Sequence, residues 1–228
     1  MAIQLDYFDL LSPEPYYLNG VGNIKSPTLK EIKKIGYNKY NNYIYILEQS
    51  KDDLIELLQF EGLENNQDIK YLDIICLSNL GEMFKELLSF FICGDIVYMP
   101  NEMMFAINNT SLVNRDNFSD VRDVILQQNY RQYESLEENL SEKERELEAI
   151  FKEGRKKSLK SSNKDLSIPN LISALYPKHK DIWDMTIYQL YDIFQRENLW
   201  NTLDFIKINY AFNGTKINFK EWYKPINN

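Results

Sequence analysis

The chain contains few of the residues from which common reactive sites are built. It has two cysteines, one histidine and eight glycines in 228 residues. One histidine is too few for an ordinary histidine-rich metal site, and eight glycines leave little material for a phosphate-binding loop. Cys76 and Cys93 lack CxxC spacing and stand in apolar surroundings, as reduced core cysteines of cytosolic proteins do. We therefore expect no catalytic residue, no metal and no cofactor.

Long apolar runs and an excess of positive charge are also missing. No stretch approaches the roughly 18 apolar residues of a membrane span. The net charge of −8 works against general nucleic-acid binding, because phosphate contacts require clustered lysine and arginine. The opening residues, MAIQLDYFDLLSPEP, show neither the basic region nor the cleavage site of a secretory signal. We expect a cytoplasmic protein that binds neither nucleic acid nor membrane.

Apolar and aromatic residues, in contrast, are plentiful. Hydrophobic residues make up 44% of the chain and aromatic residues 14%, with 16 tyrosines. This content is enough for a sizeable core and argues against disorder. Tyrosine is also common at surfaces that bind partners, because its ring is apolar and its hydroxyl remains hydrated. We favour a role in the core for these tyrosines, and a role at a partner-binding surface stays open.

The segment NIKSPTLKEIKKIG, residues 23–36, predicts a short amphipathic helix. Ser26 can cap its N-terminus, Pro27 suits a first turn, and Gly36 can adopt the left-handed conformation that ends a helix. Similar periodicity predicts helices at 52–60 and 78–91, whereas residues 71–77 are equally compatible with helix and strand.

The segment DIVYMPNEMMFAINN predicts a small β-hairpin near residues 95–108. Short apolar runs lie on both sides of Pro100 and Asn101, a pair typical of a turn. Met99, Met103 and Met104 lie at its tip. Methionine more often fills gaps in a core than forms an adaptable binding surface, so the core reading is favoured for these three residues.

The domain organisation follows from changes in composition. Residues 1–153 predict a mainly helical domain that contains the hairpin, and its last part, from about residue 137, reads as a charge-dense helix. Residues 154–167 are basic, rich in serine and poor in apolar residues, which is typical of a linker. Residues 168–228 predict a helical C-terminal subdomain, with an offset in the apolar stripe near Asn198. The expected fold class is mainly α with a small β-hairpin, that is α+β.

Three stretches together resemble a known family. They are GVGNIKSPTLKEI (20–32), VNRDNFSDVRDVILQQN (113–129) and WDMTIYQLYDIFQRENL (183–199), and EWYKPI (221–226) follows them. They resemble small proteins from the tail-morphogenesis regions of phages of Gram-positive bacteria, which are commonly taken to be tail assembly chaperones or related minor tail proteins. The matching stretches are predicted helices with start and stop signals, and they contain no catalytic signature.

This resemblance implies a non-enzymatic role in the cytoplasm of the bacterial host during infection. A chaperone of this kind binds the long tape-measure protein while the tail tube assembles around it. Other tail proteins, or a second copy of the chain, are further partners compatible with the resemblance. The alternative is a structural minor tail, neck or baseplate component of the virion, and a host-directed interaction protein is a third reading.

No binding residue transfers from the family, so the partner-binding candidates come from aromatic content alone. The candidates are Tyr188, Tyr191, Trp200 and Trp222, all in the C-terminal part. Aromatic residues also form cores, and the sequence does not separate the two roles.

Overall fold

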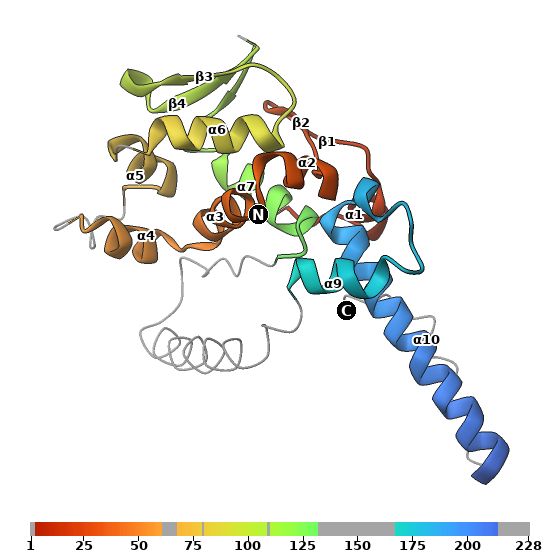
Figure 1. Ribbon diagram of the computed structural model, residues 1–228. Coiled ribbons are helices and arrows are strands. Elements are labelled where there is room, and N and C mark those ends of the chain that lie inside the picture. The colour runs from red at the N-terminus through yellow and green to blue at the C-terminus, as the bar shows by residue number, and fades with distance from the viewer. Residues whose placement is uncertain (1–2, 61–67, 79, 109, 132–166, 214–228) are drawn as a thin grey trace. The chain divides into compact units, whose positions relative to one another are not determined.

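A computed structural model describes residues 3–60, 68–78, 80–108, 110–131 and 167–213 (Figure 1). Contacts between residues divide the chain into two compact units. The first unit comprises residues 1–135 and 183–187, and the second comprises residues 136–182 and 188–228. The described part is mainly helical with two small antiparallel sheets, which confirms the expected α+β class.

The first unit contains helices and short strands. Its described helices are α1 (Tyr7–Leu11), α2 (Leu29–Ile35), α3 (Tyr37–Glu48), α4 (Lys51–Leu58), α5 (Tyr71–Leu77), α6 (Gly81–Phe91) and α7 (Phe118–Gln128). Its described strands are β1 (Tyr16–Leu18), β2 (Gly22–Ile24), β3 (Ile96–Met99), β4 (Met104–Ile107) and β5 (Ser111–Val113), and the 3₁₀ turn η1 (Pro100–Glu102) joins β3 to β4.

The core of the first unit is built around α6. Phe84 of α6 is fully buried, and its ring lies 6.1 Å from the ring of Phe105 in β4 and 5.5 Å from that of Phe118 in α7. Leu87 and Leu88 are buried on the same helix, three and four residues further on. This helical spacing places the three side chains on one face, so α6 joins the sheet to α7 through apolar contacts.

Helix α2 begins two residues later than the sequence analysis expects. Thr28 is the N-cap and forms a capping box with Glu31, so the cap is not Ser26 and Pro27 precedes the helix. The sequence offers two capping residues, and only Thr28 has a glutamate three positions later, which satisfies two backbone N–H groups at once. Ser26 is buried instead, and its hydroxyl donates to the carbonyl of Gln128. Gly36 ends the helix with a φ of 93°, as expected.

Replacing Thr28 with alanine should therefore lower the free energy of unfolding by about 1 kcal/mol, because the N–H of Glu31 loses its acceptor. Thr28→Ser keeps the hydroxyl and should stay within about 0.5 kcal/mol of the parent protein. Urea denaturation of both variants measures the difference. Equal stability of Thr28→Ala and the parent protein would show that the capping box contributes nothing.

Helix α5 is the segment for which periodicity does not distinguish helix from strand. Residues 71–77 form a helix, and its first turn is closed by Asp73, which accepts from the backbone N–H of Lys70 at 2.9 Å. Helix α6 begins at Gly81, three residues after the expected start. A segment of seven residues, six of them apolar, is too short for periodicity to separate helix from strand, so only the tertiary context decides it.

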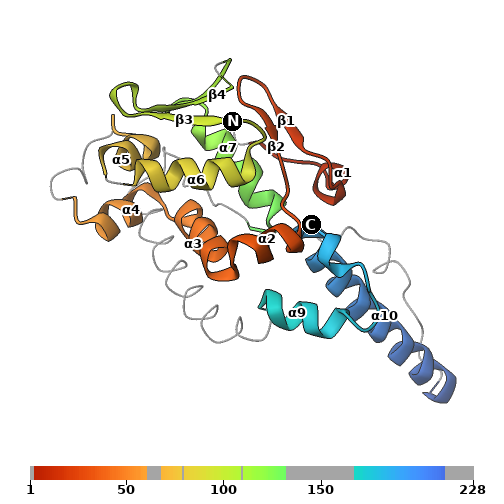
Figure 2. The ribbon, with the colours of Figure 1, turned by 45° about the horizontal axis from the view of Figure 1, so that its top comes forward.

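Strands β3, β4 and β5 form an antiparallel sheet in that order. The expected hairpin is confirmed as β3 and β4, and β5 adds a third strand that the sequence analysis did not anticipate. Helix α6 lies against one face of this sheet (Figures 1 and 2). The ring of Tyr98 in β3 stacks on that of Phe105 at 5.0 Å, and its hydroxyl donates to the carbonyl of Cys76.

A second hairpin, β1 with β2, was not expected either. It is joined to the end of α6 by backbone hydrogen bonds, from the N–H of Cys93 to the carbonyl of Asn23 and from the N–H of Lys25 to the carbonyl of Phe91. The N–H of Leu112 in β5 donates to the carbonyl of Gly20 in its turn. The strands have only three residues each, too few to produce a periodic signal.

The described elements of the second unit are helical. Helix α9 (Ile168–Leu175) has Pro169 in its first turn, as expected. The 3₁₀ turn η2 (Ile182–Asp184) precedes helix α10 (Ile187–Asn213). Helix α10 starts at Ile187, the last residue of the first unit, and remains helical through Asn198. The expected charge-dense helix and nearly all of the linker 154–167 lie outside the described residues, and the expected domain boundaries stay a prediction.

Candidate partner-binding surface

The face of the three-stranded sheet that is turned away from α6 is entirely apolar. Val97 pairs with Ala106, Ala106 pairs with Leu112, and Met99 pairs with Met104. Directly paired residues of neighbouring strands lie on the same face, and residues two apart along a strand share a face. The five residues therefore form one surface, which we call the outer sheet face.

Exposure identifies which side of the sheet is open. Val97 is 50% exposed and Leu112 is 39% exposed, whereas Phe105 and Val113, which alternate with outer-face residues, are completely buried. Met99 and Met104 are half-buried, and small Ala106 lies between the two larger side chains. A sheet with one solvated face normally alternates apolar and polar residues. Here the outer sheet face has no polar side chain, and the inner face has one, Ser111 of β5, so the outer sheet face is a candidate surface for a partner.

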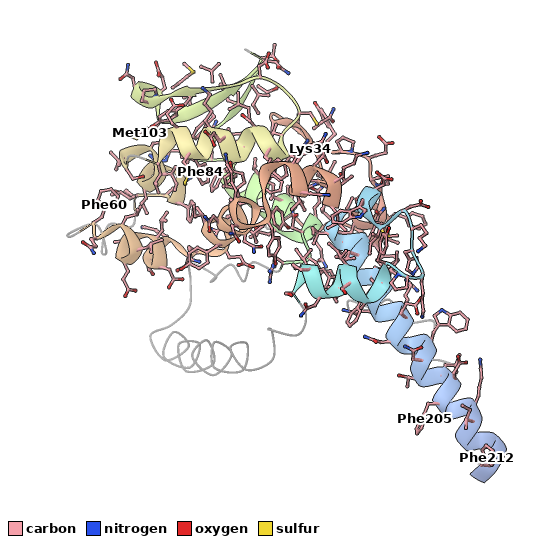
Figure 3. The ribbon with its side chains drawn as sticks, in the orientation of Figure 1. Lys34, Phe60, Phe84, Met103, Phe205 and Phe212 are labelled. Carbon is pink, nitrogen blue, oxygen red and sulfur yellow. The ribbon has the colours of Figure 1, made fainter. Side chains whose placement is uncertain are left out.

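Met103 extends the apolar surface at the end of the hairpin. It is 37% exposed and has a φ of 50°, a left-handed conformation unusual for a residue with a side chain. Figure 3 shows Met103 at the tip of the sheet and Phe84 in the core. The sequence favours a gap-filling role in the core for the three methionines, but Met103 is a surface residue.

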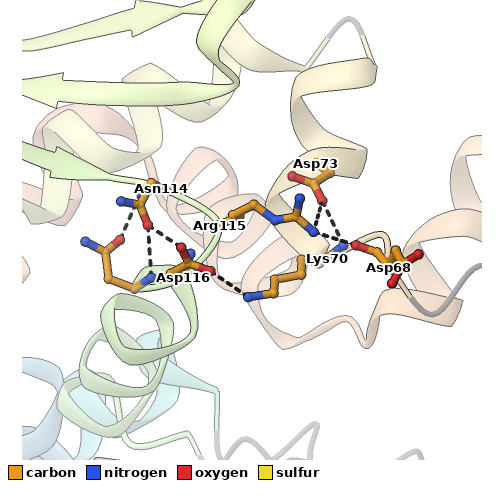
Figure 4. Close-up of polar contacts among 7 residues, drawn as sticks. Asp68, Lys70, Asp73, Asn114, Arg115 and Asp116 are labelled. Atoms are coloured by element: carbon orange, nitrogen blue, oxygen red, sulfur yellow. Dashed lines mark hydrogen bonds and ion pairs between the residues drawn. The ribbon is translucent and has the colours of Figure 1, made fainter.

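A polar cluster beside the sheet holds the loop after β5 (Figure 4). Arg115 pairs with Asp73 at 3.3 Å and donates to the carbonyl of Asp68, and Lys70 pairs with Asp116 at 2.8 Å. The hydrogen bond from Lys70 lowers the pKa of Asp116. Asn114 accepts from the N–H of Asp116 at 2.8 Å and so closes the turn. These pairs tie the start of α5 to the loop that leads into α7, and their geometry indicates a structural role.

The two cysteines lie in different environments. Burial raises the pKa of the Cys76 thiol to about 11, so this thiol stays protonated. Cys93 is exposed and is not bonded to Cys76. Within the described ranges, no group of three or more histidine, cysteine, aspartate or glutamate side chains could hold a metal ion.

The residues proposed from aromatic content lie apart from the outer sheet face along the chain. Tyr188 is buried, Tyr191 is half-buried, and both belong to α10. Trp200 is 47% exposed, with the ammonium of Lys207 5.9 Å from its ring centroid. Trp222 lies outside the described residues. Their role as partner-binding residues stays a prediction, for which Trp200 has the most accessible side chain of the three that are described.

The C-terminal half of α10 carries a second exposed apolar surface. Phe205, Ile208 and Phe212 are spaced three and four residues apart, which places them on one face of the helix. Phe205 is 64% exposed and Phe212 is 84% exposed, and Figure 3 shows both along the end of α10. None of these three residues is among the partner-binding candidates taken from aromatic content. The second unit thus has an apolar surface of its own.

His179 of the second unit is part of a small charged group. Its Nε2 atom lies 3.5 Å from a carboxylate oxygen of Glu197, which also pairs with Lys178. The hydrogen bond from Lys178 lowers the pKa of Glu197. The ion pair between Lys178 and Glu197, with His179 beside it, connects the segment before α10 to the helix itself.

Comparison with known families gives a match in the C-terminal part of the chain. Residues 157–227, roughly the last third of the chain, match the family described as the YomV second domain. This is a phage-derived family of the Bacillus phage SPbeta type, and the match favours a phage origin for the protein. No curated protein and no solved structure matches the chain. None of the described helices is long and apolar enough to span a membrane.

Proposed function

We propose that the protein is a non-enzymatic factor of phage tail morphogenesis, which acts as a chaperone by covering an apolar segment of the tape-measure protein during tail assembly. The observation that carries this proposal is the outer sheet face, because an apolar surface of this kind is suited to hold another protein. The match to a phage-derived family supports the phage context. The tape-measure protein as the partner rests on the family resemblance described above.

Co-expression with the long tape-measure protein of the same locus tests this function. We expect the tape-measure protein to become soluble and to elute with this chain in size-exclusion chromatography with light scattering. If it stays insoluble while this chain elutes alone, the chaperone proposal is wrong. Mass spectrometry of purified phage particles then tests the alternative of a structural virion component, since a chaperone is absent from finished particles.

Variants of the outer sheet face test whether this surface makes the contact. Val97→Gln combined with Leu112→Gln removes apolar side chains that are already partly exposed, so folding should be retained. Losing the burial of two such side chains costs roughly 2 kcal/mol of binding, or at least about a tenfold weaker complex. Affinity is measured by biolayer interferometry with the purified partner.

The matched control changes exposed apolar residues elsewhere in the first unit. Leu57 on α4 and Tyr45 on α3 are each 52% exposed, close to the value for Val97. Leu57→Gln combined with Tyr45→Gln should leave the affinity unchanged. Equal losses in the two double variants would show that general surface hydrophobicity, rather than the outer sheet face, holds the partner.

A further inference from the structure

The dimensions of the outer sheet face restrict what can cover it. The face is three strands wide, and its strands are three or four residues long. With neighbouring strands about 4.8 Å apart and a rise of about 3.3 Å per residue, both dimensions are near 10 Å. An α-helix with its side chains is about 10 Å across. One helix is therefore wide enough to cover the face.

The exposed side chains also favour a helix over an added strand. Strand β3 is at one edge of the sheet, and a strand that paired with this edge would leave Val97 and Leu112 uncovered. At the other edge, the N–H of Leu112 is already bonded to the carbonyl of Gly20. An occupant that buries both side chains must lie across the strands.

The charged residues around the face indicate which charge the partner carries. Residues 93–114, which contain all three strands, include only two charged residues, Asp95 and Glu102, and no lysine or arginine. The cations beside the sheet, Arg115 and Lys70, are each paired with a carboxylate. Both carboxylates are exposed, Asp95 just before β3 and Glu102 in the turn just after it. The whole chain carries a charge of −8. Opposite charges across an interface speed association and fix orientation, so basic residues should flank the apolar stripe of the partner.

We propose that the outer sheet face binds a single amphipathic helix of the partner, with its apolar stripe on Val97, Ala106 and Leu112 and with lysine or arginine beside the stripe. This inference rests on the proposed function, because it describes the segment that the chaperone holds. The partner is thereby defined by its chemistry, a helix with an apolar stripe of three or four residues and a positively charged border.

Synthetic peptides of 18 residues test this inference with the full-length protein. The first peptide has leucines at helical spacing bordered by lysines, the second has the same leucines bordered by glutamates, and the third has the composition of the first in a strand-like alternating order. Fluorescence anisotropy gives the dissociation constants, and amide chemical shifts of Val97 and Leu112 locate the site. We expect the lysine-bordered helix to bind at least about tenfold more tightly than either other peptide.

A charge exchange gives the decisive result. Asp95→Lys combined with Glu102→Lys should reverse the preference, so that the glutamate-bordered helix binds more tightly. Val97→Gln with Leu112→Gln should weaken both helices by at least about tenfold. The inference is overturned if the Asp95→Lys, Glu102→Lys protein still prefers the lysine-bordered helix. It is also overturned if the alternating peptide binds more tightly than the lysine-bordered helix.

The two proposals fail in distinguishable ways. If the tape-measure protein co-elutes while the peptides bind without regard to charge or helicity, the chaperone function stands and the helix assignment is wrong. If the lysine-bordered helix binds at the outer sheet face while the tape-measure protein never co-elutes, the site stands and the tape-measure partner is wrong.

Discussion

Gly81→Ala is expected to lower the free energy of unfolding by about 2 kcal/mol, because a methyl group at this position has no space. A Cβ atom on Gly81 would lie 2.6 Å from the hydroxyl oxygen of Tyr98 and still closer to two of its ring carbons. The Tyr98 ring is held by stacking on Phe105 and by its hydrogen bond to the carbonyl of Cys76. It cannot move aside without losing both contacts.

A double-mutant cycle separates this clash from the helix propensity of alanine. Gly81 is the first residue of α6, and replacing glycine with alanine at a position that tolerates it stabilises a protein by about 0.4–1 kcal/mol, because the unfolded chain loses freedom. In a Tyr98→Ala background, Gly81→Ala should therefore become stabilising. Urea denaturation of the four proteins measures the coupling, which we expect to be near 3 kcal/mol. Additive effects would show that Tyr98 does not restrict this position.

Gly81 also shows which parts of the fold the sequence could predict. Helix α6 was expected from the spacing of its apolar residues, and the structure confirms that its Phe84, Leu87 and Leu88 face the core. Its start at Gly81 was missed, and so was the close packing of Tyr98, seventeen positions later in the chain, which leaves no space for a Cβ atom at Gly81. Periodicity reports on burial along one element and contains no information about which distant side chain covers it.

Short elements were missed for a different reason. Strands β1, β2 and β5 have three residues each and together complete the hairpin and sheet around α6. Three residues show at most one full alternation, so their assignment depends on backbone hydrogen bonds to other segments, such as the one from Leu112 to Gly20. The β3–β4 hairpin was found because Pro100 and Asn101 separate two longer apolar runs.

The candidate surface was partly visible in the sequence. Met99, Met103 and Met104 were noted together at the hairpin tip, whereas Val97 and Leu112 were not singled out. One available signal was the run Ile96–Met99, in which residues of both parities are apolar and no polar residue marks a solvated face. Such a run is equally compatible with a strand buried on both sides. Only the placement of α6 against one face leaves the other face open.

Arg122 has a role that its sequence context does not suggest. It stands beside Asp123 on a helix, where a charged residue is normally solvated, yet it is only 4% exposed. Its guanidinium donates to the carbonyls of Leu47 and Gln49 at the end of α3 and lies 4.5 Å from the ring centroid of Tyr71. A cation at this position satisfies carbonyls that a helix C-terminus leaves without partners and complements the helix dipole.

Arg122→Met should lower the free energy of unfolding by about 3 kcal/mol, because it retains the apolar volume but leaves the carbonyls of Leu47 and Gln49 without this donor. Arg122→Lys retains the charge, but the lysine ammonium lacks the planar set of N–H donors that reaches both carbonyls at once. Its free energy of unfolding should therefore fall by about half as much. Urea denaturation gives both values. Hydrogen exchange should show the largest increase at the end of α3, because the guanidinium connects that end to α7. If Arg122→Met were as stable as the parent protein, the two hydrogen bonds would contribute only to orientation, and α3 would be held by apolar contacts alone.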